Sequence, residues 1–147
     1  MDKNVNYNFE QPEENLGYLL WQTTMLWNRQ MNRALNEINL THTQFVIMAA
    51  LGWLLKNADN VTQKEIADAS NTDRMMVSKI LRKLEKNELI KRKEHETDTR
   101  AKCVVFTDKG IDTLQRALEI KDRANALFFS ELSDKQKFGN ELRQIIK

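Results

Sequence analysis

The 147-residue sequence has few of the residues that bend or crosslink a chain, with only four glycines, one proline and one cysteine. A single cysteine excludes an internal disulfide and is typical of a reducing compartment. So little glycine and proline favours helices with short connections. No apolar run approaches the roughly 20 residues that a membrane span needs, and the polar, acidic N-terminus does not resemble a signal peptide. We therefore expect one mainly α-helical domain in the cytoplasm, without membrane contact.

Patterns for catalysis or metal binding are also missing from the sequence. His42 and His95 lie some fifty positions apart, Cys103 falls in a strand-like run, and there is no glycine-rich phosphate loop. These residues make neither a nucleophile–base pair nor a metal cluster. We therefore expect no enzyme activity, no metal and no cofactor. We interpret both histidines as solvated polar residues and Cys103 as a buried structural thiol.

The positive charge is concentrated in one segment, although the net charge is only +2. Residues 73–102 hold 10 Lys and Arg against 6 Asp and Glu, and the rest of the chain holds 13 against 15. A confined basic excess is expected where one surface meets a polyanion. Chance clustering on a solvated helix face is the alternative.

Capping sequences indicate where helices begin. Thr41-His-Thr-Gln44 and Thr62-Gln-Lys-Glu65 match the capping box. Asp73 is a natural N-cap, and Thr107 and Ser133-Asp-Lys-Gln136 begin two further helices. Together with the apolar spacing, these sequences predict six helices, over 13–38, 42–57, 62–69, 73–87, 108–130 and 134–146. Two strand-like runs, 89–92 and 103–106, flank a polar stretch and predict a β-hairpin.

The third and fourth predicted helices form a helix-turn-helix pattern. Asn71 lies in their short connection, where a left-handed residue is expected, and Asn tolerates that conformation. The hairpin that follows carries Lys91-Arg92-Lys93. A helix-turn-helix followed by a basic hairpin is the winged-helix arrangement.

The predicted helix 73–87 has two different faces. Its apolar residues recur at the spacing of a core-facing stripe, and they are Val77, Ile80, Leu81 and Leu84. The opposite face carries Met75, Lys79, Arg82 and Lys86. In a helix-turn-helix the N-terminal residues of this helix, here Arg74, Met75 and Ser78, lie against base edges. Met75 can contact a thymine methyl group, and the basic residues can meet phosphates. Met75 is alternatively an exposed residue without a contact, or packs against the hairpin.

Six short motifs follow one another between residues 65 and 110: Glu65-Ile66-Ala67, Val77-Ser78-Lys79, Leu84-Glu85, Leu89-Ile90, Asp98-x-Arg100 and Thr107-Asp-Lys-Gly110. In this order they resemble the DNA-binding core of the MarR family of bacterial transcription regulators. The six-helix layout is also similar, so the resemblance spans most of the chain. Glu88 and Asn71 depart from it, because the family usually has Gly at both positions.

The resemblance implies a single MarR-like winged helix-turn-helix domain over 1–147. Residues 39–110 would form the winged lobe, and 1–38 and 112–147 the dimerisation helices. It implies a sequence-specific regulator of double-stranded DNA, a ligand-responsive dimeric repressor. Arg100 would enter the minor groove, oriented by Asp98; a surface ion pair is the alternative. The predicted DNA-binding residues are Arg74, Met75, Ser78, Lys79, Arg82, Lys86, Asp98, Arg100 and Lys102.

The terminal helices have the apolar surface that a homodimer needs. The first carries a stripe of Leu16, Leu20, Trp27, Met31, Ala34 and Ile38, and the last carries Phe138, Leu142, Ile145 and Ile146. We expect them to interlock with a second copy, so that two recognition helices lie about one DNA turn apart over a pseudo-palindromic site. A monomer with a purely internal core is the alternative.

The family resemblance further implies a pocket between the dimer helices and the lobe for a small aromatic or anionic effector. Trp27, Met31, Phe45 and Met48 are candidates to line it, and plain core packing is the alternative. The resemblance also raises a redox role for Cys103, although a mid-strand position favours a buried thiol. The competing function is a winged-helix interaction module that docks an acidic partner without sequence-specific DNA binding.

Overall fold

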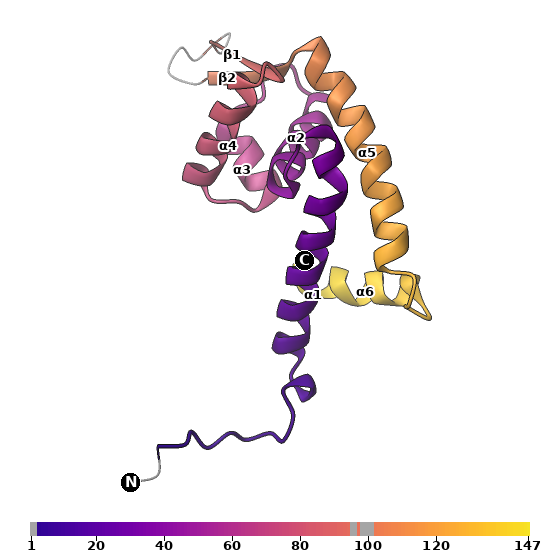
Figure 1. Ribbon diagram of the computed structural model, residues 1–147. Helices are drawn as coiled ribbons and strands as arrows, with labels where there is room; N and C mark the ends of the chain where they lie inside the picture. Colours follow the sequence, from indigo (N-terminus) through magenta and orange to yellow (C-terminus); the bar gives the residue numbers. More distant parts are fainter. Residues whose placement is uncertain (1–2, 95–96, 98–101) are drawn as a thin grey trace.

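The computed structural model describes residues 3–94, 97 and 102–147 (Figure 1). Within these residues the chain forms six α-helices, two short 3-10 turns (Pro12–Glu14 and Asn36–Ile38) and one pair of strands. The α-helices are α1 (Leu16–Leu35), α2 (His42–Leu55), α3 (Gln63–Ser70), α4 (Arg74–Lys86), α5 (Asp108–Phe128) and α6 (Lys135–Ile146). The strands are β1 (Ile90–Glu94) and β2 (Lys102–Phe106). This element order confirms the predicted mainly helical winged helix-turn-helix.

The elements α2, α3, α4, β1 and β2 gather at one end of the molecule, and we call them the lobe (Figure 1). The helices α1 and α5 run side by side away from the lobe, and α6 follows at the far end of α5 (Figure 1). Where α1 and α5 pack together, the indole N–H of Trp27 donates to Asn125 Oδ1 at 2.9 Å. The lobe therefore stands at one end of a two-helix stem.

Side-chain caps fix the helix starts in the lobe. Both predicted capping boxes are present: Thr41 Oγ1 accepts from the Gln44 N–H at 3.1 Å, and Thr62 Oγ1 accepts from the Glu65 N–H at 3.3 Å. Each cap satisfies an N–H that the helix itself leaves unpaired. Thr107 caps α5 as predicted, through the N–H of Gly110.

The hairpin is antiparallel and pairs Ile90 with Phe106 and Arg92 with Val104. The backbone N–H of Val104 also donates to the Val61 carbonyl at 2.8 Å, which attaches β2 to the segment before α3. Inside the lobe these elements enclose a fully buried apolar core, made of Ile47, Leu51, Val61, Ile66, Val77, Leu81, Leu84, Ile90 and Val104. The core thus holds the hairpin against the helix-turn-helix.

Several predicted boundaries move. The single helix predicted over 13–38 is interrupted by Asn15, whose backbone is extended, and ends in a 3-10 turn followed by left-handed Asn39. The last helix is capped by Asp134, not Ser133, through the Lys137 N–H at 2.9 Å. Leu89 lies in the turn before β1, because its N–H closes the end of α4 by donating to the Leu84 carbonyl.

Three positions have tight backbone requirements. Asn71 has φ 49°, which confirms the left-handed residue predicted for the α3–α4 turn, and Glu88 has φ 62° after α4. Gly110 packs so closely on the preceding turn that a Cβ there would lie 1.9 Å from the Leu89 carbonyl oxygen. The glycine therefore sets how near the start of α5 comes to the hairpin.

Taken singly, no helix in the described residues combines the length and apolar character required of a membrane span. One sharply bent pair, Leu16–Ile38 with His42–Leu55, meets those two criteria jointly.

Candidate nucleic-acid interface

The first turn of α4 is held rigidly by its N-cap. One carboxylate oxygen makes both capping hydrogen bonds: Asp73 Oδ1 accepts from the backbone N–H of Met75 at 2.6 Å and from that of Met76 at 3.2 Å. Just before it, the Thr72 N–H donates to the Ala67 carbonyl at 3.0 Å across the left-handed turn. The local sequence therefore fixes both the start of α4 and its angle to α3.

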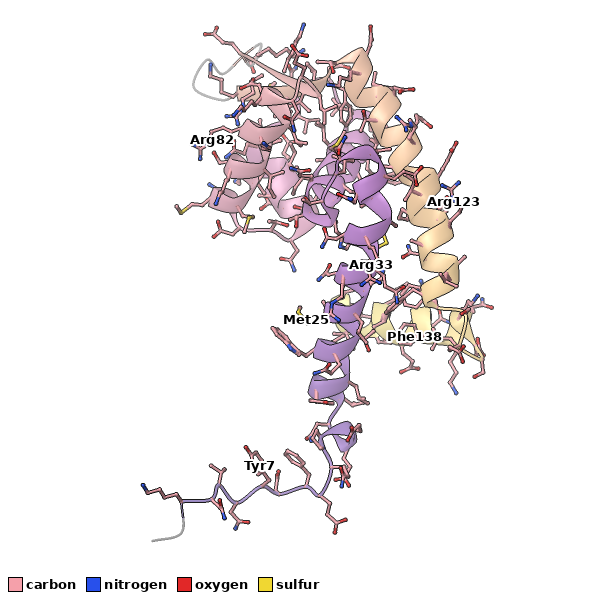
Figure 2. All side chains as sticks on the ribbon, viewed as in Figure 1. Tyr7, Met25, Arg33, Arg82, Arg123 and Phe138 are labelled. Atoms are coloured by element: carbon pink, nitrogen blue, oxygen red, sulfur yellow. The ribbon has the colours of Figure 1, made fainter. Side chains whose placement is uncertain are left out.

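The two faces of α4 are separated as the sequence predicts. Val77, Ile80, Leu81 and Leu84 are buried. Met75 is 81% exposed, and Arg74, Lys79, Arg82 and Lys86 are also exposed. Figure 2 shows Arg82 projecting outward from α4, away from the body of the molecule. An exposed methionine therefore lies at the head of a row of cations, on the face that the chain itself leaves uncovered.

The hairpin is attached to one flank of α4 through Arg92. Its Nη2 lies 3.4 Å from the Ser78 carbonyl oxygen, and its backbone N–H donates to Glu85 Oε2 at 3.3 Å. Arg92 belongs to the basic stretch Lys91-Arg92-Lys93, but of these three side chains only the two lysines are exposed. Strand alternation contains this information, because neighbouring side chains point to opposite faces. Arg92 positions the hairpin, and Ser78 is half-buried beside it.

The other flank of α4 faces the start of α2 across a groove of about 510 Å³. It is lined by Thr41, Thr43, Gln44, Met76, Lys79, Ile80, Arg82, Lys83 and Lys86. Four of these side chains are cationic and none is acidic. Met76 is 49% exposed here. Lys83 and the two threonines were not among the predicted DNA-binding residues. The helical periodicity of α4 could have placed Lys83 beside the exposed cations. The threonines could not be placed there, because the position of α2 depends on the tertiary fold.

The predicted DNA-binding residues fall into three groups. Arg74, Met75, Ser78, Lys79, Arg82 and Lys86 all lie on α4. Lys102 is the exposed first residue of β2, opposite Glu94. Asp98 and Arg100 lie outside the described residues, so the roles given to them stay predictions. His95, predicted only to be solvated, also lies outside them.

The four residues predicted to line an effector pocket are packed at the α1–α2 junction. Met31, Phe45 and Met48 are buried core residues, and Trp27 packs against them. None of these four residues lines the groove between α2 and α4 or the groove between α2 and α5. Their packing favours the alternative of plain core.

His42 is also at this junction, and the prediction that it is solvated is wrong. Its side chain is 5% exposed, its ring meets Trp27 edge to face at 4.6 Å, and its Nδ1 lies 2.6 Å from Asn28 Oδ1. The His42 backbone N–H donates to Asn32 Oδ1 at 2.7 Å. Thr41, the N-cap, is exposed to solvent, and His42, the first residue of α2, faces α1. Burial lowers the pKa of His42 below its ordinary value, since the charged ring loses solvation.

A second, more apolar groove of about 540 Å³ lies between α2 and α5. It is lined by Ala49, Gly52, Trp53, Leu55, Lys56, Phe106, Ile111, Leu114, Gln115 and Leu118. Trp53 is largely exposed at its rim, with Lys56 Nζ 4.6 Å from the ring centroid. The groove therefore offers an apolar floor and one cation, as an amphipathic anion would require.

Among the described residues, the remaining reactive side chains do not assemble into a site. Cys103 is buried, as predicted, with its Sγ 3.8 Å from Asn60 Oδ1. In the part of the chain that the structure describes, no group of three His, Cys, Asp or Glu side chains is placed to hold a metal ion.

Comparisons with known proteins agree with this geometry. A family model described as the MarR family matches residues 40–102. The chain is 35% identical over 139 residues to the HTH-type transcriptional regulator YdcH of Bacillus subtilis, covering 95% of both chains. It matches the MepR–DNA complex of S. aureus with a TM-score of 0.78 at 27% identity, covering 90% of this chain and 96% of that one.

CouR from Rhodococcus jostii, in a structure bound to p-coumaroyl-CoA, matches with a TM-score of 0.79 at 20% identity, covering 94% and 93% of the two chains. At that identity the likeness shows the shared fold. The similarity to YdcH carries more, because it extends along almost the whole of both sequences. The chain belongs to the MarR family of transcription regulators.

Proposed function

We propose that this regulator is a repressor that binds double-stranded DNA as a two-fold dimer, with α4 in the major groove, and releases it when a small molecule binds. One observation carries the DNA-binding part: the exposed row of Met75, Lys79, Arg82 and Lys86, opposite the buried stripe of α4. An α-helix fits the major groove, and such a row offers one apolar group for a thymine methyl and three cations for phosphates.

The groove beside α4 supplies contacts to the DNA backbone in this proposal. Thr43 at the start of α2 offers a hydroxyl, and Lys83 extends the cationic surface toward it. Hydroxyls, lysines and helix N-termini are frequent phosphate partners, and such contacts set the register of the protein on the duplex. The hairpin attached through Arg92 would follow the neighbouring minor groove.

The two-fold dimer is supported by apolar surface at the ends of the chain. The first half of α1 exposes Leu16, Leu20 and Trp21, and α6 has no buried residue and exposes Ile145 and Ile146. Exposed large apolar side chains in such numbers are typical of a surface that binds another protein. A second copy would cover these faces and set two α4 helices at the spacing of one DNA turn.

For the effector, the α2–α5 groove is a better candidate than the residues first predicted. Its apolar floor and Lys56 fit a small aromatic acid, and CouR was solved with an aromatic acyl-CoA. Because α5 joins the lobe to the end of the chain, an occupant of this groove would favour one spacing of the two lobes over another.

A salt titration with a matched pair of variants tests the DNA-binding proposal. The duplex would be selected from a random pool with the wild-type protein, and fluorescence anisotropy would then give Kd over a range of salt concentrations. Arg82 and Arg123 project on opposite sides of the view in Figure 2, from α4 and α5. We expect Arg82→Ala to weaken binding and to reduce the slope of log affinity against log salt by about 1. Arg123→Ala should change neither.

Two outcomes would contradict the proposal. Equal effects of the two substitutions would place the DNA elsewhere on the protein. The competing function, an interaction module, would be favoured if no duplex is enriched and any affinity for DNA is independent of salt concentration.

A further inference from the structure

The sulfur atoms of this chain are distributed very unevenly between core and surface. Met31, Met48 and Cys103 are buried, and Met25 is partly buried. Among the described residues the exposed sulfur side chains are Met75 and Met76, at 81% and 49%. The two are adjacent in the first turn of α4.

An exposed methionine is a reactive group as well as an apolar one. Oxidants reach a thioether in proportion to its access to solvent, and the product, methionine sulfoxide, is polar and can be reduced back by methionine sulfoxide reductases. The thiol of Cys103 is buried in β2, so among the described residues a dissolved oxidant reaches the α4 thioethers first. An apolar side chain exposed this fully contributes little to folding, so its oxidation should leave the core intact.

We propose that Met75, with Met76 beside it, is a reversible oxidation site for hypochlorous acid, and that its oxidation reduces the affinity of the protein for DNA. This consequence rests on the proposed function, in which Met75 meets the major groove. The sulfoxide carries an oxygen that only accepts hydrogen bonds. It replaces an apolar contact with a thymine methyl by a polar group that must lose its water.

The chemical step balances with hypochlorous acid as the only oxidant. The thioether sulfur attacks the chlorine with its lone pair, an S–Cl bond forms, and the O–Cl bond breaks with its electron pair leaving on hydroxide. Water then adds to the sulfur, the S–O bond forms, and chloride leaves with the electron pair of the S–Cl bond. The water loses its two protons, and one of them neutralises the hydroxide. The sulfur is oxidised by two electrons and the chlorine is reduced by two.

The location of the reaction is tested first, without DNA. Purified wild-type protein would receive hypochlorous acid at less than one equivalent per chain, and peptide mass spectrometry would locate the added oxygen. We expect it chiefly on Met75, next on Met76, and only later on Met31 and Met48. Circular dichroism of the same samples should be unchanged. Earlier oxidation of the buried methionines, or an even distribution, would overturn the site.

The consequence is tested by DNA affinity before and after oxidation, compared within each protein. We expect oxidised wild-type protein to bind the selected duplex about tenfold more weakly, a change of the size of one lost base contact. Methionine sulfoxide reductase should restore the original affinity. In the double variant Met75→Leu/Met76→Leu, the ratio of affinities before and after oxidant should be close to one, whatever its starting affinity. Cys103→Ser should keep the wild-type ratio.

The possible failures are separable. An unchanged affinity in oxidised wild-type protein, or an equal loss in the double leucine variant, would overturn the inference and leave the proposed function standing. Loss of sensitivity in Cys103→Ser would assign the effect to the thiol instead. If unoxidised protein binds no duplex, the proposed function and the consequence for DNA both fail, and the location of the added oxygen still decides whether Met75 is the site of reaction.

Discussion

The lobe and the ends of the chain use apolar residues in opposite ways. In the lobe most large aliphatic side chains are buried, whereas those of the first half of α1 and of α6 are exposed. The helices α4 and α6 both have an apolar stripe at helical spacing, so this periodicity alone does not show whether the stripe is covered within the chain. The lobe therefore closes its own core, and the exposed faces of the terminal helices support the proposal that they pair with a second copy.

The largest effect should come from removing matched aliphatic groups from the two regions. Leu84 is 0% exposed in the lobe and Ile145 is 76% exposed on α6. We expect Leu84→Ala to lower the free energy of unfolding by about 2–5 kcal/mol, because it leaves a cavity. At a protein concentration too low for association, Ile145→Ala should change it by less than about 0.5 kcal/mol. Urea denaturation followed by circular dichroism measures both, and similar losses would show that α6 packs within its own chain.

A charge on a terminal face should act on association instead of folding. Leu20, on α1, is 57% exposed in the single chain. We expect Leu20→Glu to weaken self-association more than tenfold, because the carboxylate would be buried without a partner in the dimer. Sedimentation equilibrium over a range of concentrations gives the constant. Asn57→Glu adds the same charge just after α2 and serves as the control. A wild-type protein that stays monomeric at every concentration would contradict the proposed dimer.

Much of the lobe could be predicted because its determinants are local in sequence. A capping box needs residues three apart, and the two faces of α4 follow from helical periodicity alone. Asn71 was predicted to be left-handed because the length of its connection and its residue type are both visible in the sequence. The structure confirms the fold class and the division of α4 into a buried and an exposed face, both of which were predicted from these local features.

Features that depend on how elements meet could not be predicted in the same way. His42 was taken as solvated because it adjoins a cap, but α1 covers it with residues ten or more positions away. The groove between α2 and α4 and the role of Arg92 likewise arise from tertiary placement. The end of the predicted first helix moved because Asn39 adopts a left-handed conformation there.

Glu88 offers a smaller test, at the turn that joins α4 to the hairpin. A left-handed conformation costs a residue with a Cβ roughly 1–2 kcal/mol, and glycine avoids the cost but loses more entropy on folding. We therefore expect Glu88→Gly to raise the free energy of unfolding by about 1 kcal/mol in urea titrations. Asn71→Gly should gain less, since Asn tolerates this conformation. A loss of stability in Glu88→Gly would mean that contacts of the glutamate outweigh the strain.

The smallest effect should appear at His42, where the lobe meets α1. Burial lowers its pKa in the folded protein, so at acid pH the unfolded chain binds a proton that the folded chain does not. The contribution of His42 to stability is therefore fully present above the ordinary histidine pKa. It is lost as the pH decreases from that value toward the lower pKa of the folded protein.

His42→Gln retains a hydrogen-bonding group for Asn28 but does not titrate. We expect the free energy of unfolding of wild type to decrease on acidification more steeply than that of the variant, when both are measured by urea denaturation at a series of pH values. His95 and all carboxylates are common to both proteins, so the difference between the two slopes isolates His42. Parallel curves would mean that the ring is protonated equally in the folded and unfolded states, and that the junction between lobe and stem is more open to water than its packing against Trp27 implies.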